Sequence, residues 1–101
     1  MKTREHTKLI FGKGFHPLID NLFNRIPEEN IFDIKSKYGR IDITTQGLSE
    51  EDYDFCLEIE RESENTCEVC GEKGELKNVN GWIIALCDKH YKEKIKTLNL
   101  K

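Results

Sequence analysis

Residues 67–90 read CEVCGEKGELKNVNGWIIALCDKH, and this stretch decides the fold of the C-terminal third of the chain. Cys67 and Cys70 form a CxxC pair followed by a glycine, and Cys87 and His90 form a CxxH pair after sixteen intervening residues. A two-residue spacing lets both side chains of a pair reach one ion from a tight turn or from the first turn of a helix. Four sulfur and nitrogen donors suit tetrahedral Zn²⁺, and a site with all four positions filled is structural and not catalytic. We therefore predict one structural Zn²⁺ bound by Cys67, Cys70, Cys87 and His90.

The sequence between the two pairs predicts a β-hairpin. Residues 75–79 and 82–86 are short strand-like runs, and Asn80-Gly81 between them is a strong signal for a two-residue hairpin loop. The chain after Cys87 predicts a helix, because apolar residues recur there at helical spacing, namely Tyr91, Ile95 and Leu98. The turn that carries the CxxC pair, residues 67–71, is called the knuckle below. A knuckle, a hairpin and a helix in this order are the layout of a treble-clef zinc finger.

The remaining cysteine and the other histidines belong to no such constellation. Cys56 lies on the apolar stripe of a predicted helix without a partner at ligand spacing, so we predict a buried core residue. His6 belongs to a polar terminus, and His16 precedes Pro17 at the predicted start of a helix. No nucleophile and base can be paired without using a predicted zinc ligand, so the sequence predicts no catalytic residue.

Upstream of the paired cysteines, the chain predicts a helix, a β-hairpin and a second helix. Residues 1–8 are polar and predicted to fray, and residues 9–11 are predicted to form a short strand or to anchor the chain end. Residues 12–14 read GKG and predict a turn, since a phosphate-binding loop needs four residues between its glycines. His16-Pro17 then opens a helix that Pro27 ends, with an apolar face made of Leu18, Ile19, Leu22, Phe23 and Ile26.

The sequence of residues 31–46 predicts the β-hairpin that lies upstream of the paired cysteines. Side chains expected on one face alternate with the others on both sides of Gly39, namely Phe32, Ile34 and Tyr38 before it and Ile41, Ile43 and Thr45 after it. This alternation predicts two strands with one buried face, which the preceding helix covers.

A second helix is predicted from Ser49 to about Asn65. Ser49 followed by Asp52 resembles a capping box, with Asp in place of the usual Glu. The predicted buried stripe consists of Phe55, Cys56 and Ile59, and is widened by Tyr53 and Leu57. The whole chain is thus predicted to be α+β: helix, β-hairpin and helix in residues 1–66, then the treble-clef zinc finger in residues 67–101. We expect these two parts to pack together as one compact unit.

Charge is unevenly placed along the chain. The net charge is −3 overall, +3 for residues 1–40, −8 for residues 41–66 and +2 for residues 67–101. The acidic segment is interpreted as the solvated face of a helix, and a surface that docks on a basic partner or mimics a polyanion is the alternative. Because the chain lacks an overall basic footprint, we expect at most weak binding of nucleic acid, through the lysines of residues 89–101.

Three stretches resemble a group of small phage and bacterial proteins with a C-terminal zinc finger. The first is the sequence from Cys67 to Leu76, followed by Gly81-Trp82 and by Leu86 to His90. Residues 35–41 are similar to a KEKFGGLR stretch of that group, and residues 14–19 are similar to its GWYPLI helix start. Phe15 stands where the group has Trp, and Arg40 replaces a Gly. The resemblance implies a phage or bacterial setting and adds little about mechanism.

The sequence therefore predicts a small zinc-binding protein that acts by contact with a protein partner, as a phage accessory or host-interaction factor. A nucleic-acid-binding zinc finger is the alternative, and a nuclease of the HNH type ranks last because no spare histidine lies near the hairpin. No run approaches the roughly 18 apolar residues of a membrane helix. With no secretion signal evident, we expect a cytoplasmic protein, in the bacterial host cell if the gene is from a phage.

Overall fold

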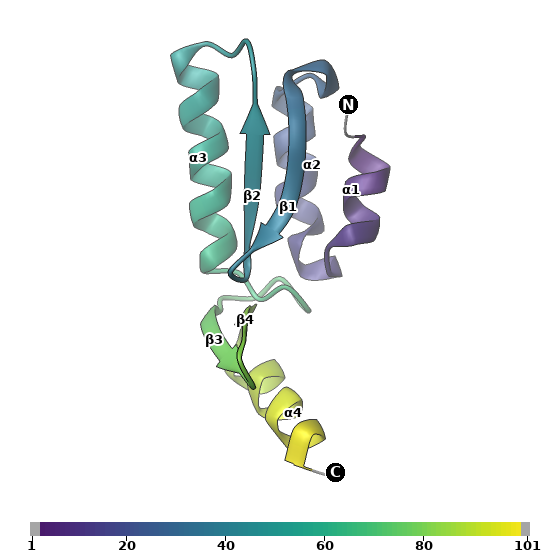
Figure 1. The fold of residues 1–101 in the computed structure, drawn as a ribbon, viewed down its shortest axis with the longest axis vertical. Coiled ribbons are helices and arrows are strands. Elements are labelled where there is room, and N and C mark those ends of the chain that lie inside the picture. Colours follow the sequence, from purple (N-terminus) through teal and green to yellow (C-terminus); the bar gives the residue numbers. More distant parts are fainter. Residues whose placement is uncertain (1–2, 100–101) are drawn as a thin grey trace.

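The computed structural model describes the backbone of residues 3–99 and the side chains of residues 3–97. The fold is α+β, with two separate two-stranded antiparallel sheets (Figure 1). Its elements are the helices α1 (Arg4–Ile10), α2 (His16–Arg25), α3 (Glu50–Glu64) and α4 (Asp88–Asn99), the strands β1 (Ile31–Lys37), β2 (Arg40–Thr45), β3 (Glu75–Val79) and β4 (Trp82–Leu86), and the short 3-10 helices Lys13–Phe15 and Glu28–Asn30. In the described part of the chain, no helix is long and apolar enough to cross a membrane.

The first helix corrects the prediction of a frayed N-terminal segment. Thr3 caps α1, because its hydroxyl oxygen accepts a hydrogen bond from the amide of His6 at 3.2 Å. Thr7 is buried, and its hydroxyl donates to the Thr3 carbonyl at 2.7 Å. Leu9 and Ile10 belong to this helix and not to a strand, whereas Phe11 is buried and anchors the chain. A capping threonine and a buried threonine thus stabilise a helix that apolar periodicity does not reveal.

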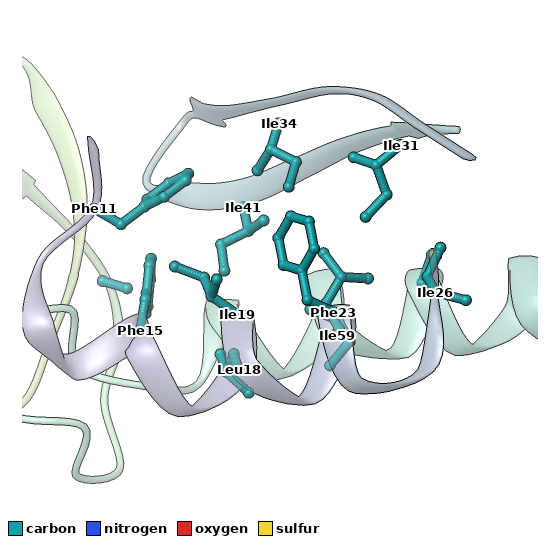
Figure 2. Packing of buried hydrophobic residues seen from close by; sticks show 13 residues of the cluster. Phe11, Phe15, Leu18, Ile19, Phe23, Ile26, Ile31, Ile34, Ile41 and Ile59 are labelled. Atoms are coloured by element: carbon teal, nitrogen blue, oxygen red, sulfur yellow. The ribbon is translucent and has the colours of Figure 1, made fainter. Parts of the chain in front are cut away.

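The main core lies between the first hairpin and the helices beneath it. Figure 2 shows Ile34 and Ile41 of the hairpin facing Ile19 and Phe23 of α2. Ile59 of α3 is buried in the same cluster. The predicted helix, hairpin and helix of residues 1–66 are therefore confirmed, and both helices cover the hairpin.

The register of the first hairpin explains two wrong predictions about its buried face. The pairing shifts between Ile31 and Asp33, so Ile31 and Ile34 both reach the core while Phe32 is 65% exposed. Such a bulge reverses the alternation of faces along a strand. Tyr38 is 72% exposed because it belongs to the two-residue loop, where its φ is +52° and that of Gly39 is +84°. Two positive φ values define a type I′ turn.

Helix α3 covers the outer edge of β2 through side-chain hydrogen bonds. The amide of Ile41 donates to Ser63 Oγ at 3.0 Å, and the amide of Ile43 donates to Glu60 Oε2 at 2.7 Å. These bonds satisfy strand groups that would otherwise lack partners at the sheet edge. They also fix which face of α3 is buried, so Tyr53 and Leu57 point to solvent and do not widen the stripe as predicted.

The second hairpin and α4 extend from one end of the first part (Figure 1). The Asn80-Gly81 loop is confirmed, with φ of +53° and +91° between the paired residues Val79 and Trp82. A small second core contains Cys67, Val79 and Leu86, against which Ile84, Cys87, Tyr91 and Ile95 pack. The side chain of Leu98, also predicted to pack here, lies outside the described residues. The molecule is elongated, with principal extents of 48 × 22 × 21 Å.

Candidate metal centre

The four predicted ligands come together in space. The sulfur atoms of Cys67, Cys70 and Cys87 and a ring nitrogen of His90 all lie within 4.8 Å of one another. His90 Nδ1 is 3.2 Å from Cys87 Sγ and 3.5 Å from Cys67 Sγ, and Cys70 Sγ is 3.9 Å from Cys87 Sγ. The cluster could hold a metal ion.

The separations of these donors fit the edges of a tetrahedron around zinc. Zn–S and Zn–N bonds of about 2.3 and 2.0 Å place two sulfurs about 3.8 Å apart and a sulfur and a nitrogen about 3.5 Å apart. The pairs at 3.2, 3.5 and 3.9 Å lie close to these edges. Three thiols and one imidazole are donors that zinc prefers over magnesium or calcium, which take oxygen ligands. The residues present therefore fit Zn²⁺.

A tight turn positions the first two ligands. The amide of Gly71 donates to the Cys67 carbonyl at 2.8 Å, and the amide of Cys67 donates to the Glu72 carbonyl at 2.7 Å. Gly71 has a φ of +83°, in the left-handed region that side chains disfavour. The glycine after the second cysteine is thus the residue that lets the chain reverse while both sulfurs face the same point.

The first turn of α4 positions the other two ligands. The Cys87 carbonyl accepts a hydrogen bond from the amide of Tyr91 at 2.9 Å, so the helix begins directly after this ligand. His90 follows within the first turn and directs Nδ1 toward the sulfurs, while its Nε2 lies 3.8 Å from Glu93 Oε2.

Backbone groups favour the thiolate of Cys67. Burial of this side chain opposes ionisation, but hydrogen bonds from the backbone of Cys87, Cys70 and Val69 outweigh burial and lower the pKa of the thiol to about 6. A thiolate is the form that binds a metal. One ligand of the cluster is therefore prepared for an ion by the backbone that surrounds it.

The knuckle also contacts the GKG turn, a relationship that sequence reasoning missed. The amide of Gly14 donates to the Glu68 carbonyl at 2.7 Å, and the amide of Gly12 donates to Glu68 Oε2 at 3.0 Å. The amide of Glu68 in turn donates to the Ala85 carbonyl at 2.9 Å. Glu68, between the first two ligands, thus joins the turn before α2 to the second hairpin. Two glycines one residue apart were the available signal, since they allow close backbone approach.

The remaining cysteine and histidines lie away from the cluster. Cys56 is buried in the main core as predicted, and desolvation, with the nearby Glu60 and Asp52, raises the pKa of its thiol to about 11. His16 begins α2, and its Nε2 lies 2.9 Å from the Lys8 carbonyl of α1. His6 lies in α1, where its amide donates to the capping Thr3. These three residues serve the packing and capping of the first part.

No family model, curated protein or solved structure matches this chain.

Proposed function

We propose that residues 67–101 form a treble-clef zinc finger whose Zn²⁺ is structural. The observation that supports this best is the closed set of four donors, three thiols and one imidazole, at near-tetrahedral separations. The order of the elements agrees, since the knuckle is followed by the β3–β4 hairpin and by the helix that bears the last two ligands. When bound, the ion contributes folding energy, because the second core is too small to order this part alone.

Mass spectrometry of the native protein tests this proposal. We expect one zinc per chain, and the Cys70→Ser variant should lose it. Cys56→Ala is the matched control, since it also removes a thiol but lies outside the cluster. Zinc that is absent from the wild-type protein, or retained undiminished in Cys70→Ser, would contradict the proposal.

We further propose that the protein acts by binding another protein and catalyses no reaction, in the phage or bacterial setting that its resemblance implies. A closed donor set leaves no open metal position for substrate. Exposed apolar side chains offer contact area on both parts, including Phe32, Tyr53, Val69, Leu76 and Trp82. Aromatic residues of this kind dominate the energetics of protein interfaces. Metal-dependent cleavage of DNA by the purified protein would contradict this proposal.

Nucleic-acid binding is the second candidate, and one observation favours it. Trp82 is 77% exposed at the end of the second hairpin, and α4 exposes Lys89, Lys92, Lys94 and Lys96. An exposed indole with nearby lysines can stack on a base while the lysines contact phosphates. The −8 charge of residues 41–66 opposes this use. Retention on DNA that falls steeply with added salt, or sub-micromolar sequence-selective binding, would favour this candidate over the first.

A further inference from the structure

Helix α3 carries an excess of negative charge that the residues around it do not balance. Its fifteen residues include eight carboxylates and one arginine. The ion pairs that this helix forms within the described residues are Arg25 with Asp52 at 2.9 Å, Arg40 with Glu60 at 3.6 Å and with Glu64 at 3.7 Å, and Arg61 with Glu58 at 3.3 Å. Eight carboxylates against these three guanidinium groups leave a net charge of −5, with every paired group counted in full.

The outward side of α3 combines this charge with exposed apolar surface. Glu50, Asp54 and Glu58 follow one another at intervals of four residues, so their side chains share one side of the helix. Tyr53 and Leu57 form a parallel apolar row beside them and are 52% and 37% exposed. Figure 1 shows α3 at the edge of the molecule, with β2 along its inner side. The outer face of α3, consisting of these two rows, is therefore open to a partner.

A hollow of about 430 Å³ lies where this face begins. It is lined by residues 45–50, in the connection from β2 to α3, and by Tyr53. Among these described lining residues, Glu50 alone carries a charge. The positive end of the helix dipole is offset here, because the first turn contains Glu50, Glu51 and Asp52. A carboxylate and an aromatic ring beside one hollow suit a guanidinium or ammonium group.

We propose that the outer face of α3 binds a basic segment of a partner protein, which places an Arg or Lys side chain in the hollow beside Glu50 and Tyr53 and an apolar side chain against Leu57. This inference rests on the proposed protein-binding function and locates its site. The net charge of −5 speeds the approach of a basic segment and selects it over other segments, and the apolar row adds affinity by burial.

The charge of this face also decides against two other occupants. An acidic segment would bring like charges together over the whole length of the helix. Nucleic acid is held through phosphates that meet lysines and arginines, and the arginines at α3 are already paired with its carboxylates. The competing basic occupant within this chain is the lysine-bearing α4 of a second copy, so the test includes the oligomeric state.

Titration of the full-length zinc-loaded protein with a short fluorescent peptide tests the proposal. The probe consists of Lys and Arg residues with one central Leu. The comparison ligands are the same peptide with Gly in place of Leu, a Glu-containing counterpart and oligothymidine. Fluorescence anisotropy measures binding, and amide chemical shifts in two-dimensional NMR locate it. Sedimentation equilibrium without peptide measures whether the protein associates with itself.

The test variants lower the charge of the face or remove its exposed ring. They are the pair Glu50→Gln with Asp54→Asn, and the single change Tyr53→Gln. The matched control is the pair Glu5→Gln with Glu72→Gln, which removes two exposed carboxylates outside α3 and gives the same net charge as the first pair. Zinc content and NMR dispersion verify that each variant is folded.

We expect the basic peptide to shift the amides of Glu50, Tyr53 and Leu57. The pair Glu50→Gln with Asp54→Asn should weaken binding roughly fivefold, as the loss of two surface ion pairs does, while the control pair changes it by less than about twofold. Tyr53→Gln, and Gly in place of Leu in the peptide, should each weaken binding about threefold, because apolar burial is lost.

Four results would overturn the proposal. Failure of the peptide to bind, or an equal loss in the control pair, would show that this face offers no specific site. Shifts confined to another surface would overturn this face and leave a protein-binding function in place. Self-association that Glu50→Gln with Asp54→Asn abolishes would assign the face to a second copy. Tighter binding of oligothymidine than of the basic peptide would overturn the proposed protein-binding function as well.

Discussion

Gly14 packs directly against the backbone of Cys67, the buried cysteine of the Cys/His cluster. A β-carbon at Gly14 would lie within 2.6 Å of the Glu68 carbonyl carbon and the Gly71 amide nitrogen, and closer still to the Cys67 carbonyl oxygen. No side chain can occupy this space without moving the knuckle. The turn before α2 and the turn of residues 67–71 are therefore fitted to each other, and we expect a change in one to affect the other.

We predict that Gly14→Ala destabilises the protein and weakens metal binding together. Since all the close neighbours are backbone atoms, the strain cannot be relieved by a rotamer change, and we expect a loss of about 2–3 kcal/mol in the free energy of unfolding. Urea unfolding and competition with a chromogenic zinc chelator measure the two effects. Lys13→Ala, at the exposed neighbouring position, is the control and should change stability by less than about 0.5 kcal/mol. An unchanged chelator competition in Gly14→Ala would show that the two turns are not coupled.

Removal of zinc should unfold the C-terminal part before the main core. The second core has few buried side chains, whereas the cluster around Ile19 and Ile41 is larger and needs no ion. We expect EDTA to abolish amide hydrogen-exchange protection in β3, β4 and α4 while β1 and β2 stay protected. Mass spectrometry of exchanged peptides measures this. Loss of protection in all four strands at once would instead show that the chain unfolds as one cooperative unit.

Ser63 should contribute more to stability than a hydroxyl usually does. It is fully buried, its Oγ accepts from the Ile41 amide at 3.0 Å, and its hydroxyl donates to the Glu60 carbonyl at 2.6 Å. Ser63→Ala leaves the Ile41 amide without a partner in a buried place, which costs about 1–3 kcal/mol. Ser36→Ala, at the exposed position paired with Ile41, is the control for denaturant unfolding. Equal effects of the two variants would refute the role assigned to Ser63.

Local signals in the sequence were sufficient to predict most of the helices and hairpins of the fold. The Ser49 cap, the Asn80-Gly81 loop and the apolar period of α2 each act within a few residues, and the structure follows all three. The paired ligand spacing likewise predicted a cluster that the structure brings together within 4.8 Å. These features depend on short-range geometry, which a sequence records directly.

The features that sequence reasoning missed depend on contacts between distant segments. The bulge before Asp33 exposes Phe32, and nothing in the alternation of residues 31–46 marks it. The buried face of α3 is set by two backbone amides of β2 that donate hydrogen bonds to Ser63 and Glu60. A prediction that counts only apolar residues along a helix does not include these two polar side chains. Helix α1 was missed for the same reason, because its buried residue is Thr7. Polar groups that become buried in tertiary contacts are thus the main source of error.

The Cys56 thiol should be inert in the folded protein. It is 3% exposed, and burial together with Glu60 and Asp52 raises its pKa to about 11. At pH 8 almost none of the Cys56 thiol is ionised, and an alkylating reagent such as iodoacetamide cannot reach the buried sulfur. We expect no alkylation of Cys56 by iodoacetamide in the zinc-loaded protein and complete alkylation in urea, as peptide mass spectrometry measures. The native pKa lies above the usual value of 9.0, so deprotonation favours the unfolded chain and stability should fall as the pH rises from 9 toward 11. Native alkylation of Cys56 at pH 8 would show that the main core opens readily.

Replacement of Tyr38 should stabilise the first hairpin. Tyr38 has a φ of +52° and precedes Gly39 at +84°, the same signs as Asn80 at +53° and Gly81 at +91° in the second hairpin. Asn adopts the left-handed region at lower cost than Tyr, and the Tyr38 ring is mostly exposed, so little burial is lost. We expect Tyr38→Asn to raise the free energy of unfolding by roughly 0.5–1 kcal/mol, measured by urea unfolding. Gly39→Ala should do the opposite, because its φ is left-handed and a β-carbon there would lie 2.7 Å from the Ile83 carbonyl oxygen. A loss of stability in Tyr38→Asn would mean that contacts of the Tyr38 ring outweigh the strain of its backbone.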